Sequence, residues 1–583
     1  MSQEHIINNF KNIAVKYNEI LMTLANGKGN SAYGAIFSQE KMQQIATKIL
    51  EKAQEKPERF AELNLEYAQK FNILMTNTLM KFIGEDIPSI FSPNKGDKRF
   101  RDEAWNQNIY FDFIKQFYLM SSDLIKTHVS HLGFEPQTQR IVEFLANQFT
   151  SAFCPSNFAL SNPEVFKESM ASGWQNIVQG MDNFLEDLKN SEGMMNINTT
   201  DRMFFKLGKN IAATPGKVVM QNDLMQLIAY EPKKQVHKTP ILIVPPCINK
   251  YYILDLSPEN SLVKWLVDND FQVFLVSWVN PDKHLADMDI EDYVKQGVID
   301  TSNYICNDLG YEKISAMGYC IGGTLLSMGL SYMAAKKIDQ IESAALMATL
   351  LDFSDPGDIG LFINEETLAA FDEELDHKGY FDGKYLAHSF SLLRANDLIW
   401  SFFVNNYLLG RRPLPFDILY WNGDPTNLPA KMFRSYMKEL YLGNKLVTPR
   451  GISILGVPID LKNINIPTFF LSCRDDHITL WKATYKGMQT VGGDKTFCLT
   501  TSGHVAGIVN PPHNRKYSYY FGGDIAHDAD KFVETSEETQ GSWWPKWMEW
   551  WTDRSTAEKV TEAKYAKWKA ISDAPGEYVK VCL

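Results

Sequence analysis

The stretch that decides the fold is residues 314–324, which read Ile-Ser-Ala-Met-Gly-Tyr-Cys-Ile-Gly-Gly-Thr. An apolar run leads into a turn of the form Gly-x-Cys-x-Gly, and a helix rich in small residues is predicted to follow. At a sharp strand-to-helix turn, the residues two before and two after the central one must be small, and Gly318 and Gly322 meet that need. The pattern predicts a nucleophile elbow with Cys320 at the positive end of a helix, where a thiolate is favoured.

The surroundings of this turn decide between an elbow and a chance turn around a buried cysteine. From about residue 205, short apolar runs alternate with amphipathic stretches of helical length. Strands that alternate with helices indicate a parallel sheet with right-handed crossovers, and an elbow belongs in that setting. The expected strands of this sheet are Pro240–Val244, Phe271–Trp278, Lys313–Met317, Ser343–Ala348, Ile466–Ser472 and Lys495–Thr500.

The chain divides into parts that differ in their pattern of apolar residues. Residues 1–204 show amphipathic helical spacing with few prolines and glycines, which predicts an all-helical N-terminal domain. Residues 205–583 are expected to form the catalytic domain. Within it the alternation stops over about 352–462, where the chain is aromatic and mostly helical, so this insertion is predicted to form a cap. The fold class expected is therefore α/β, an α/β-hydrolase fold with a helical cap insertion.

Partners for Cys320 are expected after later strands, because this fold orders its residues as nucleophile, acid and histidine. The predicted strand Ile466–Ser472 runs into Cys-Arg-Asp-Asp-His at 473–477, and the next strand is followed by His504. Either Asp475 or Asp476 could be the acid by position. His504 is the expected general base, since His477 adjoins the acid and cannot easily bridge it to Cys320.

The oxyanion donors are expected from two loops. The amide of Ile321, directly after Cys320, is placed to be one donor. The second should come from the loop after Val244, where Ile248 and Asn249 are the candidates, although the same segment could be a simple tight turn.

Composition narrows the functional classes. The formal net charge of -12 disfavours non-specific binding to nucleic acid. Seven scattered cysteines without a Cys-x-x-Cys pair indicate a reduced cytosolic protein. No apolar run approaches the ~20 residues of a membrane span, and no metal-ligand or nucleotide-binding motif is present, so neither a metal nor a cofactor is expected. The tryptophan-rich run near 543–551 is expected to lie in the core.

Several motifs together resemble one family. The segment Gly318–Gly323 is similar to the lipase-like box of polyhydroxyalkanoate synthases, in which cysteine replaces serine. The resemblance continues in order from about residue 90 to residue 580. It is carried by residues 99–105, 155–158, 245–256, 349–353, 391–394, 421–424, 502–512 and 576–580.

The resemblance implies a reaction, namely polymerisation of (R)-3-hydroxyacyl-CoA to polyester with release of CoA through a covalent thioester on Cys320. The family's acid directly precedes a histidine in Asp-His-Ile, which selects Asp476 and implies that it assists deprotonation of the attacking 3-hydroxyl. Substrate contacts are expected from Asn249, Tyr251 and His477. Arg394, in the cap, is either a contact for CoA phosphate or the partner in a structural ion pair.

The resemblance also implies an enzyme of class I, which suggests short-chain monomers such as 3-hydroxybutyryl-CoA. It further implies a homodimer, residence at cytoplasmic polyester granules, contact with the growing chain and possible granule-associated proteins. Two rivals remain. A thioesterase, lipase or depolymerase would use the same three residues to release acid, and a non-catalytic binding module would need none of them.

Overall fold

The computed structural model describes residues 3–26, 39–191, 196–555, 558–561 and 568–582. Contacts between Cα atoms divide the chain into two compact units. The first unit combines Met1–Asp201 with Ser391–Leu414, and the second combines Arg202–Phe390 with Pro415–Leu583. The polypeptide therefore leaves the second unit at residue 390 and returns to it at residue 415.

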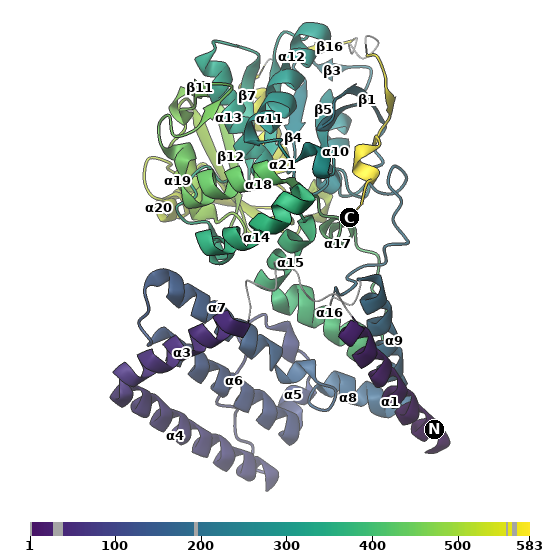
Figure 1. Ribbon diagram of the computed structural model, residues 1–583, viewed down its shortest axis with the longest axis vertical. Helices are drawn as coiled ribbons and strands as arrows, with labels where there is room; N and C mark the ends of the chain where they lie inside the picture. The colour runs from purple at the N-terminus through teal and green to yellow at the C-terminus, as the bar shows by residue number, and fades with distance from the viewer. Residues whose placement is uncertain (1–2, 27–38, 192–195, 556–557, 562–567, 583) are drawn as a thin grey trace. The chain divides into compact units, whose positions relative to one another are not determined.

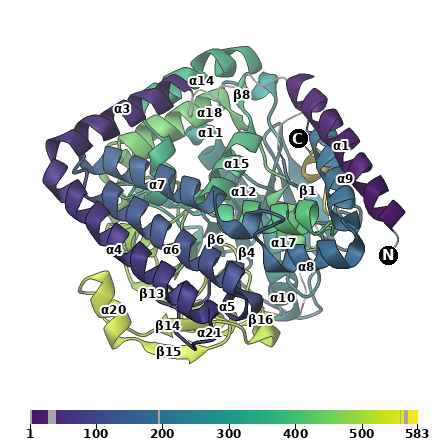
Figure 2. The same cartoon turned by 90° about the horizontal axis from the view of Figure 1, so that it is seen from below.

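The first unit is helical. Helices α4, α6 and α7 lie side by side in it (Figure 2). Prolines and capping side chains set their starts, because proline suits the first turn of a helix and an Asn or Glu oxygen satisfies its free amides. Asn108 accepts hydrogen bonds from two amides of α6, and Glu135 does so for α7. The described helices of this unit up to residue 190 include α1 (Gln3–Asn26), α3 (Gln39–Glu55), α4 (Pro57–Phe82), α6 (Ile109–Ser130), α7 (Pro136–Ala152), α8 (Pro163–Ser172) and α9 (Gln175–Asn190).

The later segment of this unit packs tightly on α9. It contains α16 (Ser401–Phe403), flanked by two π-helical turns, and follows α15 (Gly383–Leu393). A Cβ atom at Gly180 of α9 would collide with the backbone of Tyr407, so this glycine allows the two backbones to touch. Asn176 donates a hydrogen bond to the Leu408 carbonyl at 2.8 Å. The sequence from 391 to 414 therefore has its packing partners among the N-terminal helices.

The second unit is built on an eleven-stranded sheet with the order β15-β14-β13-β12-β7-β6-β4-β5-β2-β1-β17. The six strands from β13 to β5 are parallel, and the outer strands are antiparallel to their neighbours. This sheet confirms the predicted α/β-hydrolase architecture. The six parallel strands are β4 (Ile241–Val244), β5 (Val273–Trp278), β6 (Ile314–Tyr319), β7 (Ile341–Met347), β12 (Thr468–Cys473) and β13 (Lys495–Thr500). The outer, antiparallel strands are β1 (Gly216–Gln221), β2 (Met225–Tyr230), β14 (Ser518–Phe521), β15 (Glu537–Gln540) and β17 (Ser572–Asp573).

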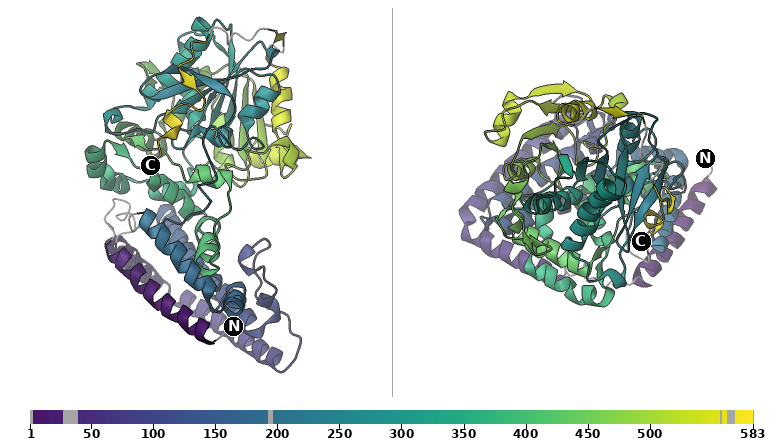
Figure 3. Two further views of the ribbon diagram at one scale, coloured as in Figure 1. Left: turned by 90° about the vertical axis from the view of Figure 1, so that its right-hand side faces the viewer. Right: turned by 90° about the horizontal axis from the view of Figure 1, so that it is seen from above.

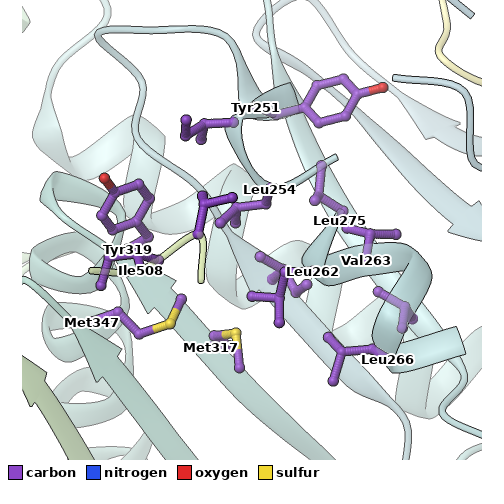
Figure 4. Close-up of a cluster of buried hydrophobic side chains, with 14 of the residues drawn as sticks. Tyr251, Leu254, Leu262, Val263, Leu266, Leu275, Met317, Tyr319, Met347 and Ile508 are labelled. Atoms are coloured by element: carbon purple, nitrogen blue, oxygen red, sulfur yellow. The ribbon is translucent and has the colours of Figure 1, made fainter. Parts of the chain in front are cut away.

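Helices lie on both faces of this sheet (Figures 1 and 3). One face packs on α10 (Leu262–Asp268) and on the tryptophans of α21 (Trp544–Thr552). Figure 4 shows part of this cluster, including Met317 of β6, Met347 of β7 and Leu262 of α10. The opposite face packs on helices that include α13 (Ile321–Ala335) and α19 (Trp481–Met488). Burial on both faces explains why the parallel strands read as continuous apolar runs.

The insertion between β7 and β12 is mostly helical where it belongs to the second unit. Its helices there include α14 (Glu365–Lys378), α17 (Asp417–Asn422) and α18 (Ala430–Ser435), and α18 continues into the π-helical segment η10 (Tyr436–Leu442). Asn444 joins the end of this insertion to its start, because its side chain bonds both Phe353 and Asp352. Among the residues that the structure describes, no helix is long and apolar enough to cross a membrane.

Candidate active site

The turn between β6 and α13 has the backbone of a nucleophile elbow. Cys320 adopts φ 54° and ψ −128°, a conformation that residues with a Cβ rarely hold. A Cβ at Gly318 would lie 2.5 Å from the Gly323 Cα, and a Cβ at Gly322 would collide with the Val244 carbonyl. The Cys320 amide is fixed by a 2.9 Å hydrogen bond to the Met347 carbonyl of β7. The surrounding strands therefore maintain the strained turn.

Helix α13 begins directly at Cys320. The amides of Gly323 and Thr324 donate to the Cys320 carbonyl, at 2.9 and 3.3 Å. The amide of Ile321 comes directly after Cys320, at the start of this first turn, where the earliest N–H groups of a helix lack a partner one turn back. This is the position from which one oxyanion donor is expected, and Ile321 stays a prediction for that role.

The acid site lies just past the end of β12. Asp476 is buried, and its Oδ1 accepts hydrogen bonds from the amides of Ile478 and Thr479 at 2.8 and 2.9 Å. Its Oδ2 accepts from the Thr479 hydroxyl at 2.6 Å and from His504 Nδ1 at 2.7 Å. Burial alone would raise the pKa of Asp476, but the charge of His504 and these hydrogen bonds hold it below its ordinary value of 3.8.

His504 follows β13, which pairs in parallel with β12. Parallel strands end at the same edge of a sheet, so the loops that carry Asp476 and His504 meet there. The Tyr319 hydroxyl donates to the His504 carbonyl at 3.1 Å, and the two rings stack with their centroids 5.3 Å apart. The same loop is also held by Trp543, whose indole donates to the Gly507 carbonyl at 2.9 Å.

The imidazole of His504 interacts with both Asp476 and Cys320. Burial lowers its pKa, but the charges of Asp476 and Cys320, with their hydrogen bonds, outweigh burial and raise the pKa of His504 to about 10. A histidine that keeps its proton beside a sulfur favours an imidazolium–thiolate pair. Because Nδ1 bonds Asp476, the other ring nitrogen, Nε2, is left to exchange a proton with Cys320.

The rival residues at the end of β12 lie elsewhere. Asp475 is exposed, and its amide bonds the Ser502 carbonyl at 3.1 Å. His477 is half-buried and does not take part in the pair formed by Asp476 and His504. Adjacent residues at a strand end point in different directions, so the structure brings Asp476 to His504 and leaves Asp475 at the surface.

The loop after β4 lies against the elbow. A Cβ at Gly322 would come within 2.6 Å of the Pro245 carbonyl oxygen, so the start of this loop touches the first turn of α13. Ile248 and Asn249 follow it and are half-buried. Tyr251, which was expected to contact substrate, is buried in the core, and its hydroxyl points away from Tyr319 (Figure 4).

Arg394 belongs to the first compact unit. Its guanidinium bonds Asp397 at 2.7 Å, three residues along the chain, and both side chains are largely exposed. The contact is a local ion pair on the surface of that unit. Among the described residues, no group of three or more His, Cys, Asp or Glu side chains could hold a metal ion.

Some supporting residues were not anticipated from the sequence. Thr479 bonds Asp476 twice, through its amide and its hydroxyl. The spacing Asp-x-x-Thr after a strand is a recognisable signal, since an aspartate often accepts hydrogen bonds from amides two and three residues on. The role of Tyr319 carried no such signal, because it depends on the position of a loop almost 200 residues away.

A mixed sheet with six central parallel strands, a cysteine at the elbow after one of them and a His–Asp pair at neighbouring strand ends together define an enzyme of the α/β-hydrolase fold. Residues 240–511 match the family model for that fold, and residues 96–266 match the model of the poly-beta-hydroxybutyrate polymerase (PhaC) N-terminus. The poly(3-hydroxyalkanoate) polymerase subunit PhaC of Rhizobium meliloti (strain 1021) is 39% identical over 529 residues, which cover 90% of this chain and 86% of the relative. The corresponding subunit of Cupriavidus necator is 38% identical over 492 residues, which cover 83% of each chain. The chain therefore belongs to the poly(3-hydroxyalkanoate) polymerase family.

Proposed function

We propose that this chain polymerises (R)-3-hydroxyacyl groups, taken from their CoA thioesters, into polyester and releases CoA. The names of its relatives support the substrate class and product. The observation that carries the proposal is the arrangement of Cys320 with the buried His504–Asp476 pair. A thiol suits this chemistry, because exchange between two thioesters is nearly isoenergetic and cysteine is both a good nucleophile and a good leaving group.

Acylation begins from the pair in which Nε2 of His504 already holds the proton of Cys320 and the sulfur is a thiolate. The sulfur then attacks the carbonyl carbon of the CoA thioester, and the oxyanion accepts a hydrogen bond from the Ile321 amide. The second donor is the amide of Ile248 or Asn249. As the bond to the CoA sulfur breaks, His504 returns its proton to the leaving thiolate, so that CoA departs as a thiol and the acyl group stays on Cys320.

Elongation uses the same base. The 3-hydroxyl of a second hydroxyacyl unit gives its proton to His504, and its oxygen attacks the Cys320 thioester. An ester forms, the carbon–sulfur bond breaks, and the Cys320 thiolate is regenerated beside His504, which keeps the proton taken from the 3-hydroxyl. Asp476 already accepts four hydrogen bonds from protein groups, so it assists deprotonation of the 3-hydroxyl through His504 rather than by direct contact.

The finer features of the family follow as part of this proposal. The chain is a class I enzyme that prefers short-chain monomers, acts as a homodimer at cytoplasmic granules, and contacts the growing polyester and granule proteins. The amino-acid sequence of residues 245–249 and the helical N-terminal unit support assignment to class I. Asn249 and His477, both half-buried near the strand ends, remain the candidates for substrate contact.

The test is to follow CoA release from (R)-3-hydroxybutyryl-CoA by the purified protein and to analyse the product. We expect polyester with little free acid. Cys320→Ala should abolish release, and Cys320→Ser should nearly abolish it, because a serine alkoxide is far harder to form and the ester is a poorer acyl carrier. Release of 3-hydroxybutyrate alone would identify a thioesterase, and full activity in Cys320→Ala would refute the nucleophile.

A further inference from the structure

The loop after β4 contains a buried lysine that the proposed reaction does not use. Lys250 is 2% exposed, and burial lowers its pKa despite the opposing charge of Asp424. Taking an ammonium group out of water is costly, so a buried lysine is retained only where specific partners offset the cost. The partners of Lys250 therefore indicate what this residue is for.

The first partners are in the insertion, in the turn at 421–426. The indole of Trp421 donates to the Lys250 carbonyl at 2.7 Å. The amide of Thr426 donates to the Ile248 carbonyl at 3.1 Å, and Asn249 forms an isolated β-bridge with Pro425. Three consecutive residues of the loop, 248 to 250, are thus fixed through their backbone to one turn.

The second partner is a segment near residue 580. The Lys250 ammonium donates to the Val581 carbonyl at 2.6 Å. This segment is itself anchored, because the Gln226 side chain accepts from the amides of Glu577 and Tyr578 at 3.1 and 3.2 Å. The Tyr578 hydroxyl donates to the Asn222 carbonyl at 2.6 Å. Lys250 therefore connects the loop to a segment held on the antiparallel edge of the sheet.

The third partner is electrostatic. Burial raises the pKa of Asp424, and the charge of Lys250 counteracts this rise. The Tyr252 hydroxyl donates to Asp424 Oδ2 at 2.7 Å, which keeps the carboxylate in place. The cation, the carboxylate and the phenol thus come from the loop and from the turn at 421–426, and each stabilises the position of the others.

We infer that Lys250 is a positioning residue that holds the backbone of Ile248 and Asn249 where it can donate to the oxyanion. The inference rests on the proposed function, because the loop matters for rate only if it supplies that donor. The start of the loop already touches the elbow at Gly322, and the Trp278 indole fixes the Pro245 carbonyl at 3.0 Å. Lys250 fixes the other end, so the donor amides lie between two anchored points.

The test compares Lys250→Met with wild type in two assays. Loss of one oxyanion donor costs about 10²–10³ in kcat, so a displaced donor should lower kcat for CoA release by roughly 10-fold or more. KM should stay within about twofold, because the oxyanion contact is made mainly in the transition state. The rate of alkylation of Cys320 by iodoacetamide should not change, since it depends on the elbow and His504 and not on this loop.

Controls separate positioning from folding. Lys264→Met removes an exposed lysine of α10 that pairs with Asp268, and it should leave both assays unchanged. Tyr252→Phe, which keeps the ring but loses the bond to Asp424, should show the same pattern as Lys250→Met with a smaller fall in kcat. If Lys250→Met misfolds, Tyr252→Phe alone decides the matter. The inference would be overturned if the folded variants kept the wild-type kcat, or if kcat and the alkylation rate of Cys320 fell together. Inactivity of the wild-type protein itself would instead count against the proposed function.

Discussion

At the scale of single residues, the choice between two adjacent aspartates is the sharpest feature of the site. Of these two carboxylates, Asp476 bonds His504, while Asp475 is exposed. We expect Asp476→Asn to lower the rate of acylation by about 10⁴, as loss of the orienting carboxylate does in a Ser-His-Asp triad. Asp475→Asn, the matched control, should stay within about twofold of wild type. Single-turnover CoA release measures both, and equal losses would show that the acid is misassigned.

The raised pKa of His504 gives a pH-dependent contribution to stability. Its pKa is about 10 in the folded chain, against 6.5 for an ordinary histidine. A raised folded-state pKa stabilises the protein fully below the unfolded value, and this stabilisation is lost as the pH rises from about 6.5 toward 10. The difference in Tm between wild type and His504→Gln should therefore shrink over that interval. A difference that stays constant or grows would contradict the assignment of the raised pKa to His504.

Sequence spacing could identify this site but not resolve it fully. The Gly-x-Cys-x-Gly turn and the order of the later residues place Cys320 and His504 from local pattern alone. The choice of Asp476 needed a family resemblance, because which of two neighbouring side chains faces His504 depends on how the chain turns after β12. The burial of Tyr251 was likewise not predictable from the sequence, because the order of residues in a short loop does not show which side chains face the core.

At the scale of elements, the glycines of the elbow determine how closely α13 approaches β4. In Gly322→Ala, the new methyl group would meet backbone atoms of Val244 and Pro245, which cannot move aside as a side chain could. Overpacking of this kind costs about 1–3 kcal/mol or more. We expect a fall in Tm and loss of activity together, measured by thermal melting and CoA release.

The control for this prediction is Gly456→Ala, because a Cβ there meets nothing within 4 Å. Its positive φ of 72° costs only about 1 kcal/mol in a residue with a side chain. Equal losses of Tm in the two variants would mean that the close approach of α13 to β4 at Gly322 adds no cost beyond that of a methyl group at an open position.

The strands were predictable because burial on both faces makes them short continuous apolar runs. The prediction Lys495–Thr500 coincides with β13, whereas the predicted Lys313–Met317 stops two residues before the end of β6. That difference has a physical reason. The last residues of β6 are Gly318 and Tyr319, which read as part of the turn although they still pair with β7.

At the scale of the whole molecule, the first compact unit is assembled from two distant parts of the sequence. Local patterns show that 391–414 is helical but cannot show which helices it packs against. Its contacts with α9 include the 2.6 Å hydrogen bond from the Tyr407 hydroxyl to Asp187 and the close approach at Gly180. The packing of 391–414 on α9 therefore depends on long-range contacts, which the periodicity of apolar residues along the sequence does not reveal.

Gly180→Ala tests that assembly. The added methyl group would overlap the Tyr407 backbone, so the segment 391–414 should no longer pack closely against α9. We expect faster hydrogen–deuterium exchange throughout 391–414, while the strands of the sheet keep their protection. Gln175→Ala, at an exposed position of the same helix, should leave exchange unchanged. Unaltered protection of 391–414 in Gly180→Ala would show that this packing does not stabilise the segment.

The central claim is that Cys320 carries the acyl group between the two half-reactions, and peptide mass spectrometry tests it most directly. The protein is quenched in acid during turnover of (R)-3-hydroxybutyryl-CoA and then digested. We expect the peptide that contains Cys320 to gain the mass of one or more 3-hydroxybutyryl units, and we expect no such gain in Cys320→Ala. Acylation of another residue in the wild-type protein would contradict the claim. So would polymer formation by the Cys320→Ala variant, which carries no adduct at position 320.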